Sequence, residues 1–345
     1  MHILLIQLKR IGDLILTTPA ITALRQKFPD AEVTLVISRE CAELLPTIGG
    51  IDRTLIIHRS LRDLATFLTV ARNKFDYCID FTRNDRSAFL AFLSRAKMRI
   101  AAHRRRSKIR RRAYNQFVQS RMRDMHTIDY NLSLLEPLGI RDVAPTVHLD
   151  LPPAFLEKAN ALCRHAGIDT PFVIFHPGSA RLEKFWEPAR WADVIEHARS
   201  NWRINALLTG GASPLEQAHL AKIKSKLSRP DDGSAGLVID LSSKTDLLTL
   251  TALIARARLI VTVDSAPMHL AAAMHTPQVV LFGPTNPFNW RPRESPAVIL
   301  QGDSTTPVRE FISGKRAPFP MKLVSTQVVI DAMDSLLSAP AAQAS

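Results

Sequence analysis

The chain has 345 residues, enough for two domains of ordinary size, and 46% of them are hydrophobic, enough for sizeable cores. Its net charge is +13, and its three cysteines lie too far apart to predict a disulfide framework or a metal site. No apolar run reaches the roughly 18–20 residues that span a bilayer, and the apolar stretch near the start is too short for a secretory signal. We therefore expect a cytoplasmic protein rather than a membrane-spanning or disulfide-stabilised secreted one.

Strand-like apolar runs alternate with helix-like segments along the whole chain. In the first half, strands are expected near residues 2–8, 31–38, 53–58, 77–81 and 98–102, and helices near 14–27, 40–47, 60–73, 84–94 and 127–138. In the second half, strands are expected near 172–178, 204–211, 236–243, 258–264 and 278–283, and helices near 188–200, 214–227, 246–255, 267–274 and 325–338. Such alternation with short connections predicts parallel sheets covered by helices on both faces.

Two sets of alternating elements predict an α/β protein with two doubly wound, Rossmann-like parallel-sheet domains. The prolines of "DVAPTVHLDLPP" (142–153) interrupt the regular pattern and favour a boundary nearby. We place the first domain at 1–160 and the second at 161–324, with a separate final helix at 325–338. Because ligands of open α/β sheets bind beyond the carboxyl ends of the strands, candidate functional residues are sought there.

The positive charge is concentrated in the first half of the chain. Residues 1–150 carry 25 Lys and Arg against 15 Asp and Glu, whereas the remaining residues carry 20 against 17. No acidic residue lies between Asp85 and Asp124, and this interval contains "HRRRSKIRRR" at 103–112. The pattern predicts an anionic partner, such as nucleic acid, an acidic membrane or a phosphorylated substrate, and a solvated basic loop is the alternative.

The strand expected at 258–264 ends in Asp264, and Ser265 follows at the start of a helix. Ser265 is suited to cap that helix, whose free N–H groups and positive dipole end favour a phosphate. His269 lies one turn further on and faces the same ligand in this interpretation. The alternative is an ordinary capped helix in which Asp264 binds backbone amides.

Two further strand ends carry polar groups. After the strand near 172–178, Ser179 lies in a Gly-Ser turn, and Lys184 follows at a distance suited to neutralising a developing phosphate charge. After Gly210 and Gly211, Glu216 lies in the first turn of the next helix, where it either complements the dipole or accepts hydrogen bonds from a ribose. A surface lysine and a dipole-complementing acid are the alternatives.

The first strand is followed by "LKRIGDLILTTP" (8–19), in which Gly12 turns the chain and Asp13 comes at the start of a helix. From the residues alone, Asp13 is either a helix-capping acid or a catalytic group. The chain has no GxGxxG fingerprint and no GxxxxGK[ST] loop, which argues against a nicotinamide enzyme and a P-loop ATPase. It also shows no zinc-ligand spacing and no Asp-x-Asp metal motif, so no metal and no cofactor are expected.

Several segments together resemble glycosyltransferase family 9, which contains the ADP-heptose:lipopolysaccharide heptosyltransferases, and most closely its heptosyltransferase III-like members. The matching segments span nearly the whole chain: "RIGDLILTTPAI" (10–21), "HTIDYNLSLLEPLGI" (126–140), "HPGSARLEKFW" (176–186), "LTGG" (208–211) and "VDSAPMHLAAAMHTPQVVLFGPTNPFNW" (263–290). The resemblance implies a GT-B architecture, two Rossmann-like domains facing across a cleft, with the helix at 325–338 crossing back to the first domain.

The resemblance also implies an activity. The enzyme would transfer heptose, with inversion, from ADP-L-glycero-D-manno-heptose to the lipopolysaccharide inner core of the Kdo-lipid A type. It would act as a peripheral protein on the anionic cytoplasmic face of the inner membrane, without a metal.

Residue by residue, the resemblance gives Asp13 the role of general base, and it places Lys184 and Ser179 at the diphosphate. Donor-binding roles fall on a further set of residues: Gly12, Glu216, Asp264, Ser265, Ala266 and His269. Ala266 departs from members that have Gly there, where the backbone approaches the diphosphate more closely. We expect a basic group near the acceptor, without individual roles: Arg99, Arg104, Arg105, Arg106 and Lys108.

Other interpretations remain open. A GT-B transferase that uses another nucleotide sugar or acceptor is the main alternative, and a catalytically silent paralogue is a second. A nucleic-acid-binding protein is a third, motivated by "RRRSKIRRR", but the chain has no zinc finger or RNA-binding signature and only 6% aromatic residues. We therefore expect no nucleic acid among its partners.

Overall fold

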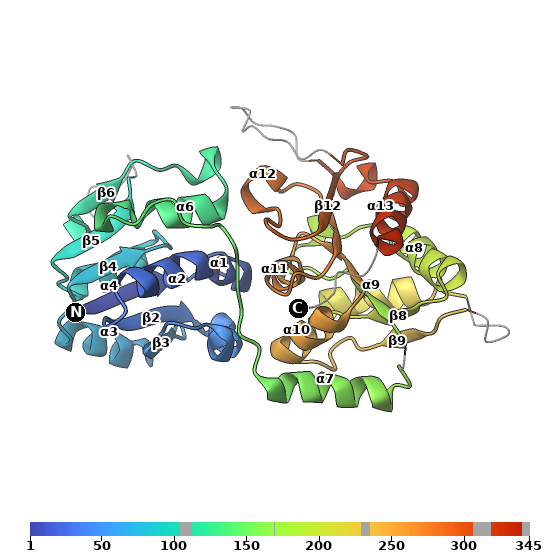
Figure 1. Ribbon diagram of the computed structural model, residues 1–345, viewed down its shortest axis with the longest axis horizontal. Helices are drawn as coiled ribbons and strands as arrows, with labels where there is room; N and C mark the ends of the chain where they lie inside the picture. Colours follow the sequence, from blue (N-terminus) through green and yellow to red (C-terminus); the bar gives the residue numbers. More distant parts are fainter. Residues whose placement is uncertain (104–111, 169, 229–234, 306–318, 340–345) are drawn as a thin grey trace. The chain divides into compact units, whose positions relative to one another are not determined.

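The computed structural model describes residues 1–103, 112–168, 170–228, 235–305 and 319–339. The chain forms two compact units, Met1–Asp150 and Leu151–Ser345 (Figure 1). The boundary therefore falls earlier than the predicted one at 160. The reason is helix α7 (Pro153–His165), which packs on α10 (Leu247–Arg256) of the second unit. Its N-terminal prolines start the helix, where a missing N–H costs nothing, instead of breaking the pattern.

The first unit is built on a six-stranded parallel sheet in the order β3-β2-β1-β4-β5-β6. The strands are β1 (His2–Gln7), β2 (Glu32–Ser38), β3 (Arg53–Ile57), β4 (Tyr77–Asp80), β5 (Met98–Ala102) and β6 (Gln116–Val118). The central run Ile3–Ile6 is completely buried, as expected of a parallel strand that is covered on both faces. The three-residue β6 is too short to give a sequence signal and was not predicted.

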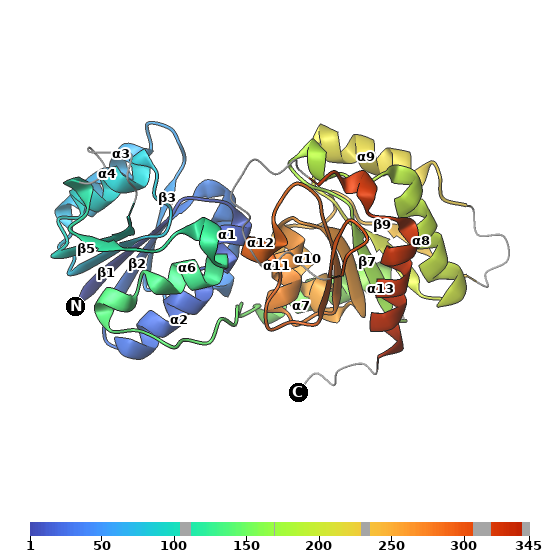
Figure 2. The same cartoon turned by 90° about the horizontal axis from the view of Figure 1, so that it is seen from above.

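Helices cover both faces of this sheet: α1 (Ile11–Ile15), α2 (Thr18–Lys27), α3 (Asp63–Arg72), α4 (Asp85–Leu93) and α6 (Thr127–Ser133), with a 3₁₀ segment, η1 (Arg39–Thr47). Figure 2 shows α3 and α4 on one face, with α2 and α6 on the other. The single helix predicted at 14–27 is divided into α1 and α2. Pro19 lacks the N–H that would bond to Ile15, and the hydroxyl of Thr18 donates to that carbonyl instead, at 2.8 Å.

The second unit repeats the design with the strand order β12-β11-β10-β7-β8-β9. Its strands are β7 (Phe172–His176), β8 (Asn205–Leu208), β9 (Val238–Asp240), β10 (Leu259–Val263), β11 (Gln278–Phe282) and β12 (Ala297–Gln301). Numbered from the start of each unit, both sheets have the order 3-2-1-4-5-6 of the classic dinucleotide-binding fold. All the strands that were predicted are present, and β12 is an additional edge strand.

Besides α7 and α10, the helices of the second unit are α8 (Pro188–Asn201), α9 (Pro214–Lys224), α11 (Ala266–Ala273), α12 (Pro287–Trp290) and α13 (Thr326–Ser338). Two fully buried tryptophans, Trp186 and Trp191, meet edge to face in its core, with ring centroids 5.4 Å apart. No helix in the described part of the chain combines the length and hydropathy that crossing a membrane requires.

Helix α13 belongs to the second unit, which corrects the expectation that it crosses back to the first. It packs on α8 and on β10, β11 and β12, and its side chains Val329, Met333 and Leu337 enter the core of that unit. Asp334 accepts one hydrogen bond from the Trp202 ring N–H and contacts His197, which joins α13 to the end of α8. The apolar side of α13 therefore packs into the core of the second unit.

Substituting Met333→Ala tests this packing. Met333 is completely buried, so its truncation should lower the free energy of unfolding of the second unit by about 2–5 kcal/mol. The measurement is denaturant unfolding, followed by tryptophan fluorescence, because all four tryptophans lie in this unit. The exposed Ser335→Ala on the same helix is the matched control, and equal midpoints for the two variants would contradict the packing of α13.

Candidate active site

Both sheets reverse their strand order at one point, between β1 and β4 in the first unit and between β7 and β10 in the second. Ligands of such folds bind outside the carboxyl ends of the strands at this switch point. The chain places polar side chains just after three of these four strands: Asp13 after β1, Lys184 after β7 and Asp264 after β10. Each unit therefore carries its own cluster of candidate functional residues.

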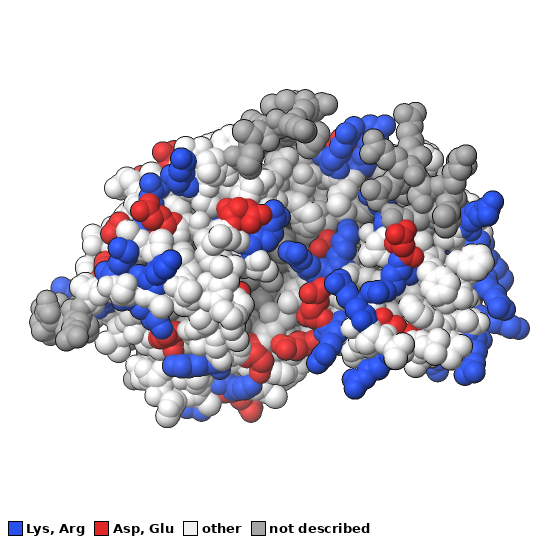
Figure 3. All heavy atoms as spheres, turned by 180° about the vertical axis from the view of Figure 1, so that it is seen from behind, with Lys and Arg blue, Asp and Glu red and all other residues white. Residues whose placement is uncertain are grey.

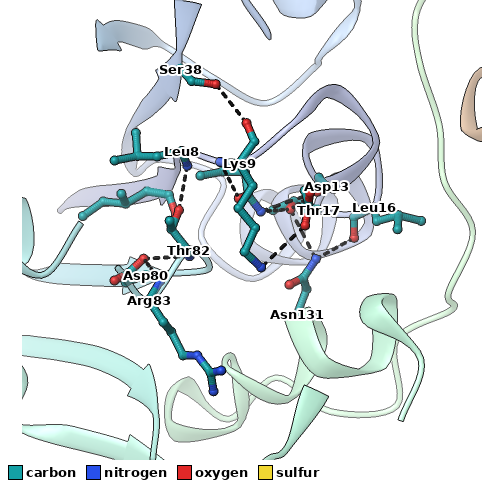
Figure 4. Close-up of polar contacts among 12 residues, drawn as sticks. Leu8, Lys9, Asp13, Leu16, Thr17, Ser38, Asp80, Thr82, Arg83 and Asn131 are labelled. Carbon is teal, nitrogen blue, oxygen red and sulfur yellow. Dashed lines mark hydrogen bonds and ion pairs between the residues drawn. The ribbon is translucent and has the colours of Figure 1, made fainter. Parts of the chain in front are cut away.

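Asp13 lies in the first turn of α1, immediately beyond β1 (Figure 4). The side chain of the cap residue Arg10 makes no capping bond to this helix. Its carboxylate instead lies 3.5 Å from the ammonium of Lys9. Within the described residues, the buried Oδ1 has no hydrogen-bond partner at normal distance. The carboxylate therefore retains the capacity to accept a proton at Oδ1, and a capping role for Asp13 remains compatible with this geometry.

Burial raises the pKa of the Asp13 carboxyl above its ordinary value, and the positive charge of Lys9 together with the Arg10 backbone partly opposes this rise. A raised pKa increases the basicity of the carboxylate, which suits a group that takes a proton from a hydroxyl. Lys9 was not singled out from the sequence. The signal was present, because a lysine four residues before an aspartate at a helix start is spaced for an ion pair.

The turn that carries Asp13 is held by a buried polar network. The Thr17 hydroxyl donates to the carbonyl of Asp13 at 2.7 Å, and the Gln7 amide donates to Thr17 at 2.9 Å. The amide of Asn131, from α6, donates to the carbonyl of Leu16 at 2.9 Å and to the Thr17 hydroxyl at 3.2 Å. Asn131 belongs to the segment 126–140 and Asp13 to the segment 10–21, and both segments carry the family resemblance. These bonds show that the two segments are in direct contact.

A second network supports the same turn from the end of β4. The buried Asp80 accepts hydrogen bonds from Tyr114 at 2.5 Å, from Ser87 at 2.7 Å and from the backbone N–H of Thr82 at 2.7 Å. The Thr82 hydroxyl in turn accepts from the backbone N–H of Leu8 at 2.6 Å (Figure 4). Asp80 therefore holds the β4 end against the β1–α1 turn and acts on Asp13 only through this backbone.

In the second unit, Lys184 and Asp264 meet although 80 residues separate them. The ammonium donates to the Asp264 carboxylate at 2.6 Å and to its backbone carbonyl at 2.8 Å. Both side chains are almost buried, with exposed fractions of 13% and 8%. The structure thus joins the ends of β7 and β10 by a charged contact at the switch point, where the sequence predicted the diphosphate of a donor.

His269 and Ser265 accompany this pair on α11. Burial lowers the pKa of His269 to about 4, opposed by Asp264 and reinforced by Lys184, so its ring is neutral near pH 7. Its buried Nδ1 has no partner among the described residues. Ser265 does not cap α11 as predicted, because its hydroxyl donates to the carbonyl of Val263, at 3.3 Å. Ala266 is the first residue of α11.

Glu216 lies against the two glycine turns. Its carboxylate accepts hydrogen bonds from the N–H of Gly211 at 2.8 Å and from the Ser213 hydroxyl at 3.3 Å. A Cβ atom on Gly178 would lie 2.2 Å from the Glu216 Oε2, so a larger residue there would displace this carboxylate. Ser179, the next residue, is buried and accepts the N–H of Arg181 at 3.3 Å.

His176, at the end of β7, is a further buried group that the sequence did not single out. Its Nδ1 lies 2.9 Å from the Thr209 hydroxyl, and its Nε2 would lie 3.4 Å from a Cβ on Gly178. Burial lowers the pKa of His176 to about 4, so it is neutral near pH 7. It thus supports the turn that contains Gly178 and Ser179 without adding a charge.

The other predicted residues fall in two groups. Arg99 lies at the amino end of β5, where its guanidinium donates to the carbonyls of Ala113 and Ala96, both at 2.8 Å. It is therefore a structural residue at the edge opposite Asp13, and its placement near an acceptor is not supported. Gly12 lies within α1. The remaining acceptor candidates lie outside the described residues: Arg104, Arg105, Arg106 and Lys108.

Among the described residues, no cluster of three or more His, Cys, Asp or Glu is arranged to hold a metal ion. The positive groups that lie closest to Asp13 and Asp264 are lysines. The chemistry available from the described side chains is therefore proton transfer at Asp13 and binding of an anion near Lys184.

Comparison with known proteins places these features in a family. The model of glycosyltransferase family 9 (heptosyltransferase) matches residues 64–316. Lipopolysaccharide heptosyltransferase 3 of Escherichia coli is 29% identical over 293 residues, which cover 81% of this chain and 83% of that protein. A family 9 glycosyl transferase from Veillonella parvula superimposes with a TM-score of 0.84 at 25% identity, covering 97% of each chain.

The E. coli ADP-heptose lps heptosyltransferase II superimposes with a TM-score of 0.77 over 98% of each chain, at 19% identity. This likeness confirms the predicted GT-B class of fold, with two parallel sheets of six strands. The family match covers well over half of the chain and includes Lys184, Glu216 and Asp264. The protein therefore belongs to glycosyltransferase family 9 (heptosyltransferase) and is a glycosyltransferase.

Proposed function

We propose that this enzyme transfers a heptose, with inversion, from ADP-L-glycero-D-manno-heptose to the inner core of lipopolysaccharide, with Asp13 as the general base. The observation that carries the proposal is the buried Asp13 carboxylate, whose Oδ1 lies 3.5 Å from the ammonium of Lys9 and has no hydrogen-bond partner among the described residues. The names of the relatives support the class of donor and acceptor, since they include lipopolysaccharide heptosyltransferase 3 and an ADP-heptose heptosyltransferase.

An inverting transfer requires one base on the acceptor hydroxyl and stabilisation of the leaving diphosphate. Asp13 suits the first task, because burial raises the pKa of its carboxyl and the turn around it is held by Thr17 and Gln7. As the acceptor oxygen attacks the anomeric carbon, its proton moves to Asp13 while the bond from that carbon to the diphosphate oxygen breaks. The charge of Lys9 favours the ionised form of this carboxylate.

The second task suits Lys184. Its ammonium donates to the Asp264 carboxylate, which fixes the position of this lysine at the switch point. A diphosphate bound there would share that ammonium and accept a hydrogen bond from the backbone N–H of Ala266 at the start of α11. Ser179, Ser265 and His269 lie at the same strand ends and would contact the phosphates. No metal is needed in this scheme.

Glu216 is proposed to bind the ribose of the donor. Its carboxylate already accepts the Gly211 N–H and the Ser213 hydroxyl, so one of its oxygens is pre-oriented at the end of β8. A ribose hydroxyl would donate a hydrogen bond to the same carboxylate, beside or in place of those from Gly211 and Ser213. The close approach of Gly178 to the carboxylate holds Glu216 against this turn.

The basic first half of the chain favours an anionic acceptor at the membrane. Inner-core carboxylates and phosphates would attract the arginine-rich segment around 104–112, and we propose that the enzyme works as a peripheral protein on the cytoplasmic face of the inner membrane. A GT-B transferase that uses another nucleotide sugar or acceptor is the alternative function.

Asp13→Asn should reduce turnover by at least about 100-fold, the lower range for the loss of a general base, while ADP affinity stays nearly unchanged. The assay is the mass of truncated lipopolysaccharide cores after incubation with ADP-heptose, with ADP binding followed by calorimetry. Near-normal turnover of the variant would remove Asp13 from the role of base.

Lys9→Met is the matched control, because it keeps the carboxylate and removes only the neighbouring charge. A base must be ionised, so turnover falls as the pH falls through its pKa, and burial places this fall at a higher pH than for an ordinary carboxyl. Without Lys9, the pKa of Asp13 rises further, and the acidic limb of the pH–turnover profile should move to higher pH. An unshifted limb would separate Lys9 from the titration of the base.

Lys184→Gln should weaken ADP binding by about tenfold or more and lower turnover with it, since a charge-assisted bond to the phosphates is lost. Glutamine keeps a hydrogen-bond donor toward Asp264, and Lys158→Gln, which removes another ion pair of the same unit, is the control. ADP should also raise the melting temperature of the wild-type protein. Stabilisation by UDP but not by ADP would favour the alternative function.

A further inference from the structure

The first unit exposes an unusual group of large apolar side chains on α3, α4 and the segment before α3. We define the α3–α4 patch by five residues: Leu61, Leu64, Leu68, Phe89 and Phe92. Their exposed fractions run from 43% for Leu68 to 96% for Leu61. Isolated exposed leucines are common on protein surfaces, but a contiguous group that contains two phenylalanines marks an interaction surface.

The five side chains form one surface. Leu64 and Leu68 are four residues apart and share the outer side of α3, whose inner side buries Asp63, Thr66 and Val70. Leu61 lies in the turn just before α3 and is almost fully exposed. Phe89 and Phe92 are three residues apart on α4, which packs beside α3. The rings of Phe67 and Phe89 meet edge to face with centroids 5.3 Å apart and join the two helices.

The surroundings of the patch are basic. Between residues 59 and 97 the chain has eight Lys and Arg and four Asp. Two of these acids, Asp63 and Asp80, are buried, and Asp76 pairs with Lys97. Exposed basic side chains lie at the ends of these helices and beside them: Arg59, Arg62, Arg72, Lys74 and Arg95. Figure 3 looks onto this side of the first unit, where uncharged side chains are bordered by Lys and Arg.

We propose that the α3–α4 patch is a docking surface for an anionic lipid bilayer. Apolar side chains flanked by arginines match a membrane interface, in which leucine and phenylalanine enter the acyl boundary while basic groups remain among anionic headgroups. A second copy of this chain is the less suitable occupant, because two identical basic borders would repel each other in a symmetric contact.

The α3–α4 patch begins at the same edge of the sheet as Asp13. Leu61 lies between β3 and α3 and thus at the carboxyl edge of the sheet, the same edge from which Asp13 follows β1. A unit docked by this patch would hold that edge close to the lipid surface. The benefit of this placement for catalysis rests on the proposed function, in which the acceptor is a saccharide attached to a membrane lipid. Binding of the patch to a bilayer does not depend on that function.

The test is co-sedimentation of the full-length protein with vesicles of phosphatidylethanolamine and phosphatidylglycerol, and with vesicles of phosphatidylcholine alone. The triple variant Leu61→Asn, Leu64→Gln and Phe92→Gln should bind the anionic vesicles at least about tenfold more weakly than the wild type, because three exposed apolar side chains are lost. Arg62→Gln with Arg72→Gln should reduce binding severalfold and make it less sensitive to salt.

The matched control replaces exposed leucines of the second unit: Leu156→Gln, Leu237→Asn and Leu323→Gln. This control should bind vesicles like the wild type. Unchanged melting temperature and ADP affinity of the patch variant establish that it is folded. Equal vesicle binding by patch and control variants would overturn the proposal, as would a wild-type dimer that the patch substitutions convert to a monomer.

Transfer to a deacylated core saccharide separates this proposal from the proposed function. The patch variant should transfer heptose to the soluble acceptor like the wild type, and should lose activity only on acceptor embedded in vesicles. A wild type that binds vesicles through the patch but transfers no heptose would reject the function and leave the docking intact. If the patch variant and the wild type transfer heptose equally well to acceptor embedded in vesicles, the docking proposal is rejected and the proposed function stands.

Discussion

Each sheet of this protein is buried on both faces, and this constraint determines where its chemistry can lie. Strands such as Ile3–Ile6 and Leu259–Val263 carry almost no exposed side chains, so polar groups that meet a ligand must lie beyond the strand ends. The reversal of strand order then selects one place in each unit, between β1 and β4 or between β7 and β10. Asp13 and the Lys184–Asp264 pair lie at these two places.

The two clusters use an aspartate and a lysine in different ways. Lys184 donates directly to Asp264 at 2.6 Å and to its carbonyl, so that a charge is held in position at the cost of two desolvated groups. Lys9 lies 3.5 Å from Asp13, too far for a strong hydrogen bond, and the buried carboxyl keeps a raised pKa. The first arrangement suits binding of an anion, and the second suits acceptance of a proton.

Local sequence patterns predicted much of the fold, because a strand buried on both faces must be a short apolar run between turns. The predicted strands are all present, and the errors have separate causes. Pro152 and Pro153 were taken as breaks in the pattern, but they begin α7. Pro19 divides a helix that hydrophobic spacing alone predicts as continuous. The placement of α13 came from the family resemblance, whereas its apolar stripe fits the core of its own unit.

The site was predictable where a residue follows a strand directly and was missed where the contact depends on tertiary structure. Asp264 directly follows β10, and Asp13 and Lys184 lie in the segments after β1 and β7, but the bond from Leu8 to Thr82 joins residues 74 positions apart, and no local pattern indicates it. The α3–α4 patch also depends on tertiary structure and could not be predicted from the sequence. Its leucines and phenylalanines read as core residues at helical spacing, because a pattern cannot tell which of two apolar sides of a helix meets the sheet. Only the packing of Val70 and Thr66 toward β3 shows that Leu64 and Leu68 must face outward, and this outward face makes a lipid partner physically reasonable.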